Sequence, residues 1–148
     1  MINNKTDFYF SISSNPGSSG SMLHNSFFRL VSKNAIYLPL KVKKIENFLN
    51  FFREINSAGF SVSTPFKSEI IKYLDNKNKI VKSTFSCNTV VNKKGKLYGY
   101  NTDYLAIHYI LKHKVKNKNY PKILYSLSNI LDDRARSVDF ILMLIIVD

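Results

Sequence analysis

The chain has 148 residues, of which 45% are hydrophobic and 22% are charged, and a net charge of +12 at pH 7. These values exclude a wholly disordered chain, and the length allows one domain with a real core rather than two. The single cysteine, Cys87, excludes an internal disulfide and suits a reducing cytoplasm. Its apolar position predicts a packed side chain rather than a nucleophile. The first residues are polar and lack the pattern of a signal peptide, so we expect a cytoplasmic protein.

Hydrophobic periodicity predicts strands and helices that alternate through most of the chain. The expected elements, in order, are a strand over 8–12, a helix over 22–33, a strand over 35–42, a helix over 45–55, a strand over 59–62, a helix over 68–74 and a loop over 75–79. Such alternation is typical of an α/β fold, with a mostly parallel sheet covered by helices on both faces. Ligands on these sheets collect at the carboxyl ends of the strands.

A hairpin signal follows, with β-branched and aromatic residues on both sides of Lys93-Lys94-Gly95. We expect antiparallel strands over 89–91 and 97–100, and then a helix over 102–112. The hairpin would bring Asn88 to the residues Asn101, Thr102 and Asp103, so that an amide, a hydroxyl and a carboxylate converge. Such a patch suits a small polyhydroxylated ligand. Ordinary turn and cap chemistry, with Asn101 or Asp103 starting the helix, also explains these residues and is the reading that the pattern alone favours.

The basic residues are spread along the chain and are densest over 112–118. Clustered lysines can contact phosphates of a nucleic acid, but this stretch has no interleaved aromatic residues and no binding motif. The pattern favours a solvated linker, and we expect no nucleic-acid partner. The apolar run over 138–147 is shorter than the roughly 20 residues that a bilayer span needs, so we expect no membrane segment.

Three blocks of sequence carry a more specific pattern. They read NPGSSGSMLHN over 15–25, GFSVSTPFK over 59–67 and NTVVNKKGKLYGYNTD over 88–103. The last two resemble the Gly-Phe-x-Val-Thr-x-Pro-x-Lys and the Asn-Thr, Gly-Lys-Leu-x-Gly, Asn-Thr-Asp signatures of shikimate dehydrogenases. The first resembles the Asn-Pro-x-x-His-Ser-x-Ser-Pro-x-x-His-Asn loop of that family. The resemblance implies a substrate-binding domain over 1–112 and, over 113–148, a basic linker with a degenerate start of a nucleotide-binding domain.

Members of this family reduce 3-dehydroshikimate to shikimate with NADP, in aromatic amino acid biosynthesis. The resemblance implies that Lys67 exchanges the proton on the reacting oxygen and that Asp103 fixes Lys67. Replacing Lys67 with alanine is then expected to abolish turnover and leave folding intact. Ser18 matches the first of two serines that hold the substrate carboxylate. The implied substrate-binding residues are Ser18, Ser63, Asn88, Thr102 and Asp103.

The chain departs from the family pattern in two places near the expected site. In the first loop Gly20 replaces the second serine, Ser21 replaces a proline, and two residues are missing before Ser18. Ahead of Asn88 the family usually has Gly-Ala, and here the pair is Phe85-Ser86. The bulk of Phe85 is expected to press on the site.

The nucleotide-binding signature is missing, since Gly99 is the last glycine and residues 120–148 contain no glycine-rich turn. NADP is the cofactor of the family, yet we expect no cofactor and no metal to bind this chain alone. Two functions therefore compete. One is a shikimate dehydrogenase by descent that keeps the substrate half and has little or no turnover. The other is a non-catalytic module that binds shikimate, quinate or a related hydroxy acid. A basic interaction protein is a third reading that rests only on charge.

Overall fold

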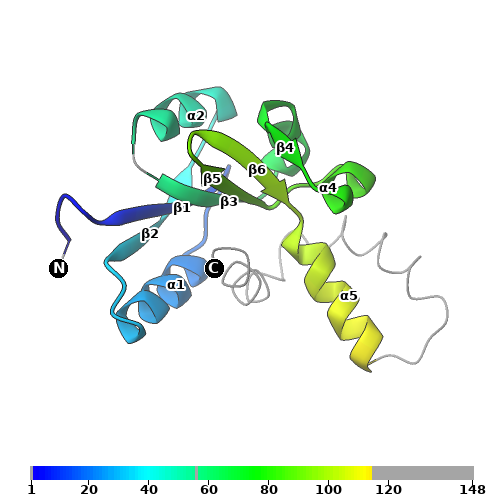
Figure 1. The fold of residues 1–148 in the computed structure, drawn as a ribbon, viewed down its shortest axis with the longest axis horizontal. Helices are drawn as coiled ribbons and strands as arrows, with labels where there is room; N and C mark the ends of the chain where they lie inside the picture. The colour runs from blue at the N-terminus through cyan, green and yellow to red at the C-terminus, as the bar shows by residue number, and fades with distance from the viewer. Residues whose placement is uncertain (1, 56, 115–148) are drawn as a thin grey trace.

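The computed structural model describes residues 2–55 and 57–114, which form one mixed sheet with helices (Figure 1). The strands are β1 (Asp7–Ser13), β2 (Ala35–Lys41), β3 (Ser57–Val62), β4 (Asn76–Lys77), β5 (Thr89–Lys93) and β6 (Lys96–Tyr100). The helices are α1 (Ser19–Leu30), α2 (Ile45–Glu54), α3 (Phe66–Glu69), a 3₁₀ turn η1 (Ile70–Tyr73), α4 (Lys79–Thr84) and α5 (Thr102–Lys114). Expectations for 115–148 lie outside the described residues.

The strand order across the sheet is β2-β1-β3-β5-β6-β4. Parallel pairing joins β1 to β2, β1 to β3 and β4 to β6, whereas β5 runs antiparallel to both of its neighbours. Helices α1 and α2 make the crossovers that place β1 between β2 and β3. The expected α/β fold, a mostly parallel sheet with an antiparallel hairpin, is confirmed.

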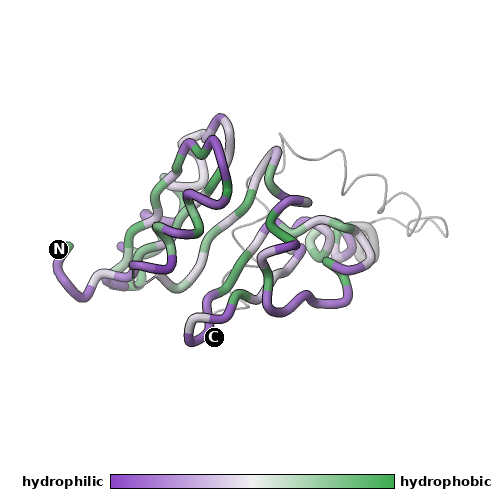
Figure 2. The backbone as a smooth tube through the Cα atoms, turned by 90° about the horizontal axis from the view of Figure 1, so that it is seen from above, coloured by the Kyte–Doolittle hydropathy of each residue, from purple (hydrophilic) through white to green (hydrophobic). Residues whose placement is uncertain are grey.

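The two faces of the sheet are buried under different helices, because side chains alternate along each strand. On β1, Phe10 and Ile12 belong to the main core with α2 residues such as Phe48, while Tyr9 packs in a second cluster with Phe28 of α1. In the view of Figure 1, α2 lies above the sheet and α1 and α5 lie below it. Along the tube in Figure 2, hydrophobic stretches give way to hydrophilic ones at the N-terminal end and at the turns. The expected coverage of both faces is confirmed.

The expected loop over 75–79 is wrong, because this polar stretch contains β4 and the start of α4. Its polar side chains satisfy backbone groups. Asn78 caps α4 by accepting a hydrogen bond from the Val81 amide at 2.8 Å, and Asp75 accepts one from the Leu97 amide at 2.7 Å. Elsewhere the boundaries shift. Helix α1 starts three residues earlier than expected and also ends earlier, and the helix expected over 68–74 begins at Phe66 and divides into α3 and η1.

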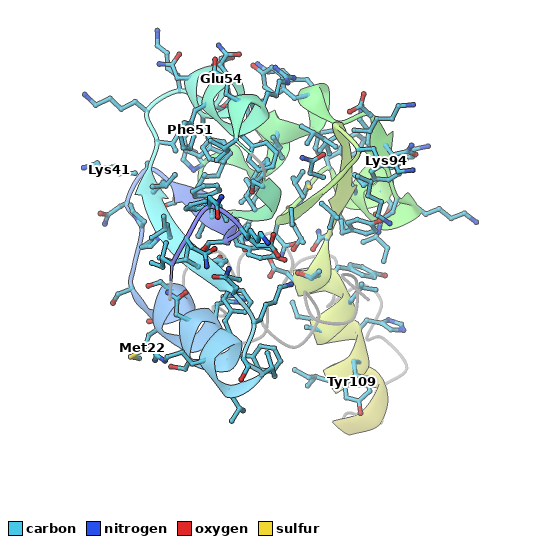
Figure 3. All side chains as sticks on the ribbon, turned by 60° about the vertical axis from the view of Figure 1, so that its left-hand side comes forward. Met22, Lys41, Phe51, Glu54, Lys94 and Tyr109 are labelled. Atoms are coloured by element: carbon cyan, nitrogen blue, oxygen red, sulfur yellow. The ribbon has the colours of Figure 1, made fainter. Side chains whose placement is uncertain are left out.

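The hairpin forms as predicted, with Lys94 and Gly95 in the two-residue turn at φ 53° and 83°. Positive φ at both positions is the geometry that suits the twist of the flanking strands. Figure 3 labels Lys94 at this turn, on the opposite side of the molecule from Met22 of α1. The other end of the hairpin pairs Thr89 with Tyr100. Asn88 and Asn101 therefore extend beyond neighbouring strand ends, as the sequence predicted.

Gly59 lets β3 and β5 approach closely. A Cβ built there would lie 2.5 Å from the Val90 carbonyl oxygen, a backbone atom that cannot move aside alone. The absence of a side chain thus places the end of β3 beside Asn88, where the candidate site lies. Within the described part of the chain, no helix is long and apolar enough to cross a bilayer.

Candidate functional site

The site is centred on an ion pair between Lys67 and Asp103. The lysine lies in the first turn of α3, just past β3, and the aspartate lies in the first turn of α5, just past β6. Lys67 Nζ donates to Asp103 Oδ2 at 2.9 Å, and the two side chains are only 16% and 6% exposed. A carboxylate in the first turn also suits the positive end of the helix dipole. The fold thus unites two groups that are 36 residues apart and fixes the ammonium by a charge-assisted hydrogen bond.

Asn88 and Thr102 form a buried hydrogen-bonded pair beside this ion pair. Asn88 Nδ2 donates to Thr102 Oγ1 at 2.8 Å, and the Thr102 amide donates to Asn88 Oδ1, also at 2.8 Å. Thr89 Oγ1 adds a bond to Asn88 Oδ1 at 3.1 Å. These contacts fix the orientation of the Asn88 amide. They also fix the start of α5, from which Asp103 projects.

Backbone hydrogen bonds tie the elements of the site together. The Val62 amide donates to the Asn88 carbonyl at 2.7 Å, and the Cys87 amide donates to the Lys67 carbonyl at 2.9 Å. The Asn88 amide donates to the Tyr100 carbonyl at 3.1 Å. The ends of β3 and β6, the start of β5 and helix α3 therefore meet at one edge of the sheet. This is the edge where ligands bind in open α/β folds.

The two predicted serines occupy different surroundings. Ser63 is half-buried between β3 and α3, and its amide donates to the Ile12 carbonyl at 2.9 Å. It lies four residues before Lys67, on the same connection. Ser18 is exposed at the N-cap of α1 and its side chain makes no capping bond. Among the described residues, no hydrogen bond joins the Ser18 hydroxyl to the cluster of Lys67, Asp103 and Asn88.

The capping explanation holds for Asn101, which lies next to the site. Its Oδ1 accepts from the Tyr104 amide at 2.9 Å, and its Nδ2 donates to Thr84 Oγ1 at 3.1 Å. Asn101 thus caps α5 and attaches it to α4, the helix that periodicity missed. Asp103, by contrast, directs its carboxylate to Lys67.

Phe85 and Cys87 lie just before Asn88. The expected pressure of Phe85 on the site is wrong, because its side chain is 72% exposed. Its backbone has φ 52°, a left-handed conformation that glycine adopts at lower cost. Cys87 is fully buried, and burial raises the pKa of its thiol to about 12. It is a packed side chain, as predicted, and not a thiolate nucleophile.

His24 and Tyr37 form a buried aromatic pair that the sequence interpretation did not single out. Their rings stack with centroids 4.1 Å apart and planes 15° apart. Burial lowers the pKa of His24 to about 4, so the imidazole is neutral at pH 7. The signal that could have identified it is the His-Asn ending of the first-loop motif. No group of three potential metal ligands occurs among the residues that the structure describes.

His24 makes the stability of the fold sensitive to acid. Its folded pKa, about 4, lies below the ordinary 6.5, so protonation favours the unfolded chain. The free energy of unfolding has its full value above about pH 6.5. It decreases as the pH falls through 4, by roughly 3 kcal/mol in total, because the unfolded chain binds the proton more tightly. Urea unfolding at pH 7 and pH 4.5 should show a smaller loss for His24→Phe, which keeps an aromatic ring against Tyr37. Equal losses in the two proteins would contradict this role.

Comparisons with known proteins point to one family. Residues 16–90 match the family model described as the shikimate dehydrogenase substrate binding domain. The chain is 42% identical over 106 residues to a shikimate dehydrogenase (NADP(+)) of Pyrococcus furiosus, covering 70% of this chain and 39% of the relative. It is 34% identical over 119 residues to a shikimate dehydrogenase-like protein of Haemophilus influenzae, covering 80% and 44%.

Solved structures give the same result. A shikimate 5-dehydrogenase-like protein superposes with a TM-score of 0.76 at 34% identity, covering 80% of this chain and 44% of that one. The shikimate 5-dehydrogenase of Listeria monocytogenes, solved with shikimate and NAD, gives a TM-score of 0.71 at 31% identity, covering 76% and 40%. The chain therefore spans less than half the length of these relatives.

Proposed function

Because this chain belongs to the shikimate dehydrogenase family, we propose that its Lys67–Asp103 site binds shikimate and 3-dehydroshikimate. The observation that carries the proposal is the ion pair at 2.9 Å, largely shielded from solvent at the edge of the sheet. Asn88 lies beside it, with its amide oriented by Thr102. A cation, a carboxylate and an amide so arranged suit a ring that carries several oxygens.

In this proposal Lys67 exchanges a proton with the reacting oxygen of the ring. When a ketone is reduced, the oxygen gains negative charge, and the ammonium of Lys67 donates the proton that makes it a hydroxyl. Asp103 holds Lys67 in place through their hydrogen bond. Asn88 and Ser63 would bind neighbouring oxygens. Thr102 orients Asn88 from a buried position, and Ser18 would contribute only if a ligand brings the start of α1 into the site.

The described residues do not fit NADP in the dinucleotide-binding manner. That mode needs a glycine-rich turn between a strand and a helix, where backbone amides meet the pyrophosphate. Gly59 and Gly99 lie inside strands, and Gly95 lies in the hairpin turn. In the loop before α1 the one glycine is Gly17, and Gly20 already lies within α1. In the family the cofactor supplies the hydride, and here that chemistry requires residues outside 2–114 or a second chain.

A non-catalytic binding module for shikimate, quinate or a related hydroxy acid is the second candidate. The retained ion pair together with the absent glycine-rich turn favours it. Calorimetric titration separates the candidates, with shikimate and quinate added in the presence and absence of NADP, followed by an assay of NADP reduction. Binding of shikimate without turnover would support a module, and turnover would support an enzyme. Binding of no hydroxy acid would refute both.

A further inference from the structure

Tyr37 extends a polar row from the candidate site across the sheet. Its hydroxyl lies 2.8 Å from Ser61 Oγ, although β1 separates β2 from β3. The tyrosine side chain therefore crosses above β1. Since Phe60 and Val62 face the main core under α2, Ser61 faces the other side, towards α1. The Tyr37–Ser61 pair thus lies on the face of the sheet from which α1 and α5 project (Figure 1).

Ser61 connects this pair to the ion-pair site. It is directly opposite Thr89 in the antiparallel pairing of β3 and β5, a position that places side chains about 5 Å apart. Thr89 Oγ1 in turn lies 3.1 Å from Thr102 Oγ1, and Asp103 follows Thr102 in the chain. The Tyr37–Ser61 pair and the Thr89–Thr102 pair therefore face each other across β3 and β5, and Thr102 is the chain neighbour of Asp103 in the ion pair.

The position of Tyr37 is fixed from several sides. Asn25 holds its backbone with two side-chain hydrogen bonds, one from the Tyr37 amide at 2.8 Å and one to the Tyr37 carbonyl at 2.9 Å. His24 stacks on its ring. Tyr37 is therefore fixed at its backbone, at its ring and at its hydroxyl. Such fixation is what a preorganised binding group requires.

Gly20 leaves space next to the Tyr37 hydroxyl. A Cβ at residue 20 would lie 3.7 Å from Tyr37 Cε1 and 4.0 Å from Tyr37 Oη, in ordinary contact. A serine at this position would therefore fit, and its hydroxyl would lie near that of Tyr37. The first-loop motif has a serine at this position, and this chain has Gly20 instead. The Tyr37 hydroxyl therefore lies next to the position that the serine hydroxyl of the motif would occupy.

We propose that Tyr37 and Ser61 form a subsite for the carboxylate of a ring-shaped hydroxy acid whose reacting hydroxyl is bound by Lys67 and Asp103. The subsite rests on the proposed function, because it needs a ligand at the ion pair. Hydroxyl groups of tyrosine and serine donate charge-assisted hydrogen bonds to a carboxylate, which only accepts them. The pair is largely shielded from water, with Ser61 8% and Tyr37 3% exposed, and this shielding strengthens such bonds.

The test compares two ligands and two substitutions. Shikimate and its methyl ester differ at the carboxyl group alone, where the ester lacks the negative charge and carries a methyl group, so their affinities isolate interactions at that group. Calorimetry on Tyr37→Phe and on Ser61→Ala should show shikimate affinity reduced roughly tenfold or more, as loss of a hydrogen bond to a charged group implies. Affinity for the methyl ester should change much less. Tyr73→Phe, which removes a tyrosine hydroxyl that donates to Glu46, is the matched control and should bind both ligands normally.

Equal losses for the acid and the ester in Tyr37→Phe, with the fold intact by circular dichroism, would assign the hydroxyl a structural role and overturn the subsite. Unchanged shikimate affinity in both variants would also overturn it. These failures differ from failure of the proposed function. In that case the unsubstituted chain would not bind shikimate, or Lys67→Met would bind it as tightly as the unsubstituted chain does.

Discussion

Replacement of Lys67 with alanine is expected to weaken shikimate binding by roughly 10- to 100-fold, as loss of a hydrogen bond from a charged group implies. The sequence alone suggested that this change leaves folding intact. The structure adds a cost, because Asp103 is 6% exposed and its carboxylate would lose its cation. Removing one partner of a shielded ion pair leaves an uncompensated charge, and we expect the free energy of unfolding to fall by about 3 kcal/mol. Calorimetry and urea unfolding measure the two effects separately.

Lys72 provides the matched control. Lys72 lies in η1, directly after α3, and its Nζ is 3.8 Å from Glu46 and 3.9 Å from Glu69, but its side chain is 60% exposed. Exposed pairs contribute little to stability because water and salt screen them, so Lys72→Ala should retain both stability and shikimate binding. If Lys72→Ala and Lys67→Ala weakened binding equally, net charge rather than the ion pair would be responsible. In the presence of a nucleotide-binding partner, Lys67→Ala should also abolish turnover.

Substitution of Thr102 with valine is expected to lower both stability and ligand affinity. Thr102 is fully buried, so its effect on the ligand is exerted through Asn88. Valine has almost the same shape, but it removes the hydroxyl that accepts from Asn88 Nδ2. A buried amide that loses its partner costs about 1–3 kcal/mol. The Asn88 amide would then be held less firmly, through the bonds to its Oδ1, so shikimate binding should weaken several-fold. Urea unfolding and calorimetry on the same samples provide the measurements.

Thr102→Ser distinguishes the hydroxyl from the shape of the side chain. Serine keeps the hydrogen bonds and removes one methyl group, which is expected to cost about 1 kcal/mol of stability. Affinity for shikimate should remain close to that of the unsubstituted chain. A serine variant that bound as poorly as the valine variant would show that packing at the start of α5, and not orientation of Asn88, determines affinity.

Local chemistry along the chain was sufficient to predict the hairpin and most of the sheet. Apolar runs separated by turns predicted β1, β2 and β3, and the Lys94-Gly95 turn selected the hairpin because both residues adopt positive φ. The same logic failed over 75–79, where Asn78 caps a helix too short to show periodicity. Capping depends on a single hydrogen bond between one side chain and one backbone amide, so hydrophobic periodicity does not reveal it.

The motifs of the sequence named Lys67, Asp103 and Asn88 as candidates, but only the tertiary structure determined what each contacts. Gly59 allows β3 to pair closely with β5, and the Val62 amide at the end of β3 then donates to the Asn88 carbonyl. Because the Asn88 side chain also bonds to Thr102, the end of β3 is aligned with the start of α5. Lys67 and Asp103 meet because of that alignment. Tyr37 carried no motif at all. Its hydroxyl reaches Ser61 because β1 lies between β2 and β3, and such a contact across a strand depends on strand order, which residue spacing does not encode.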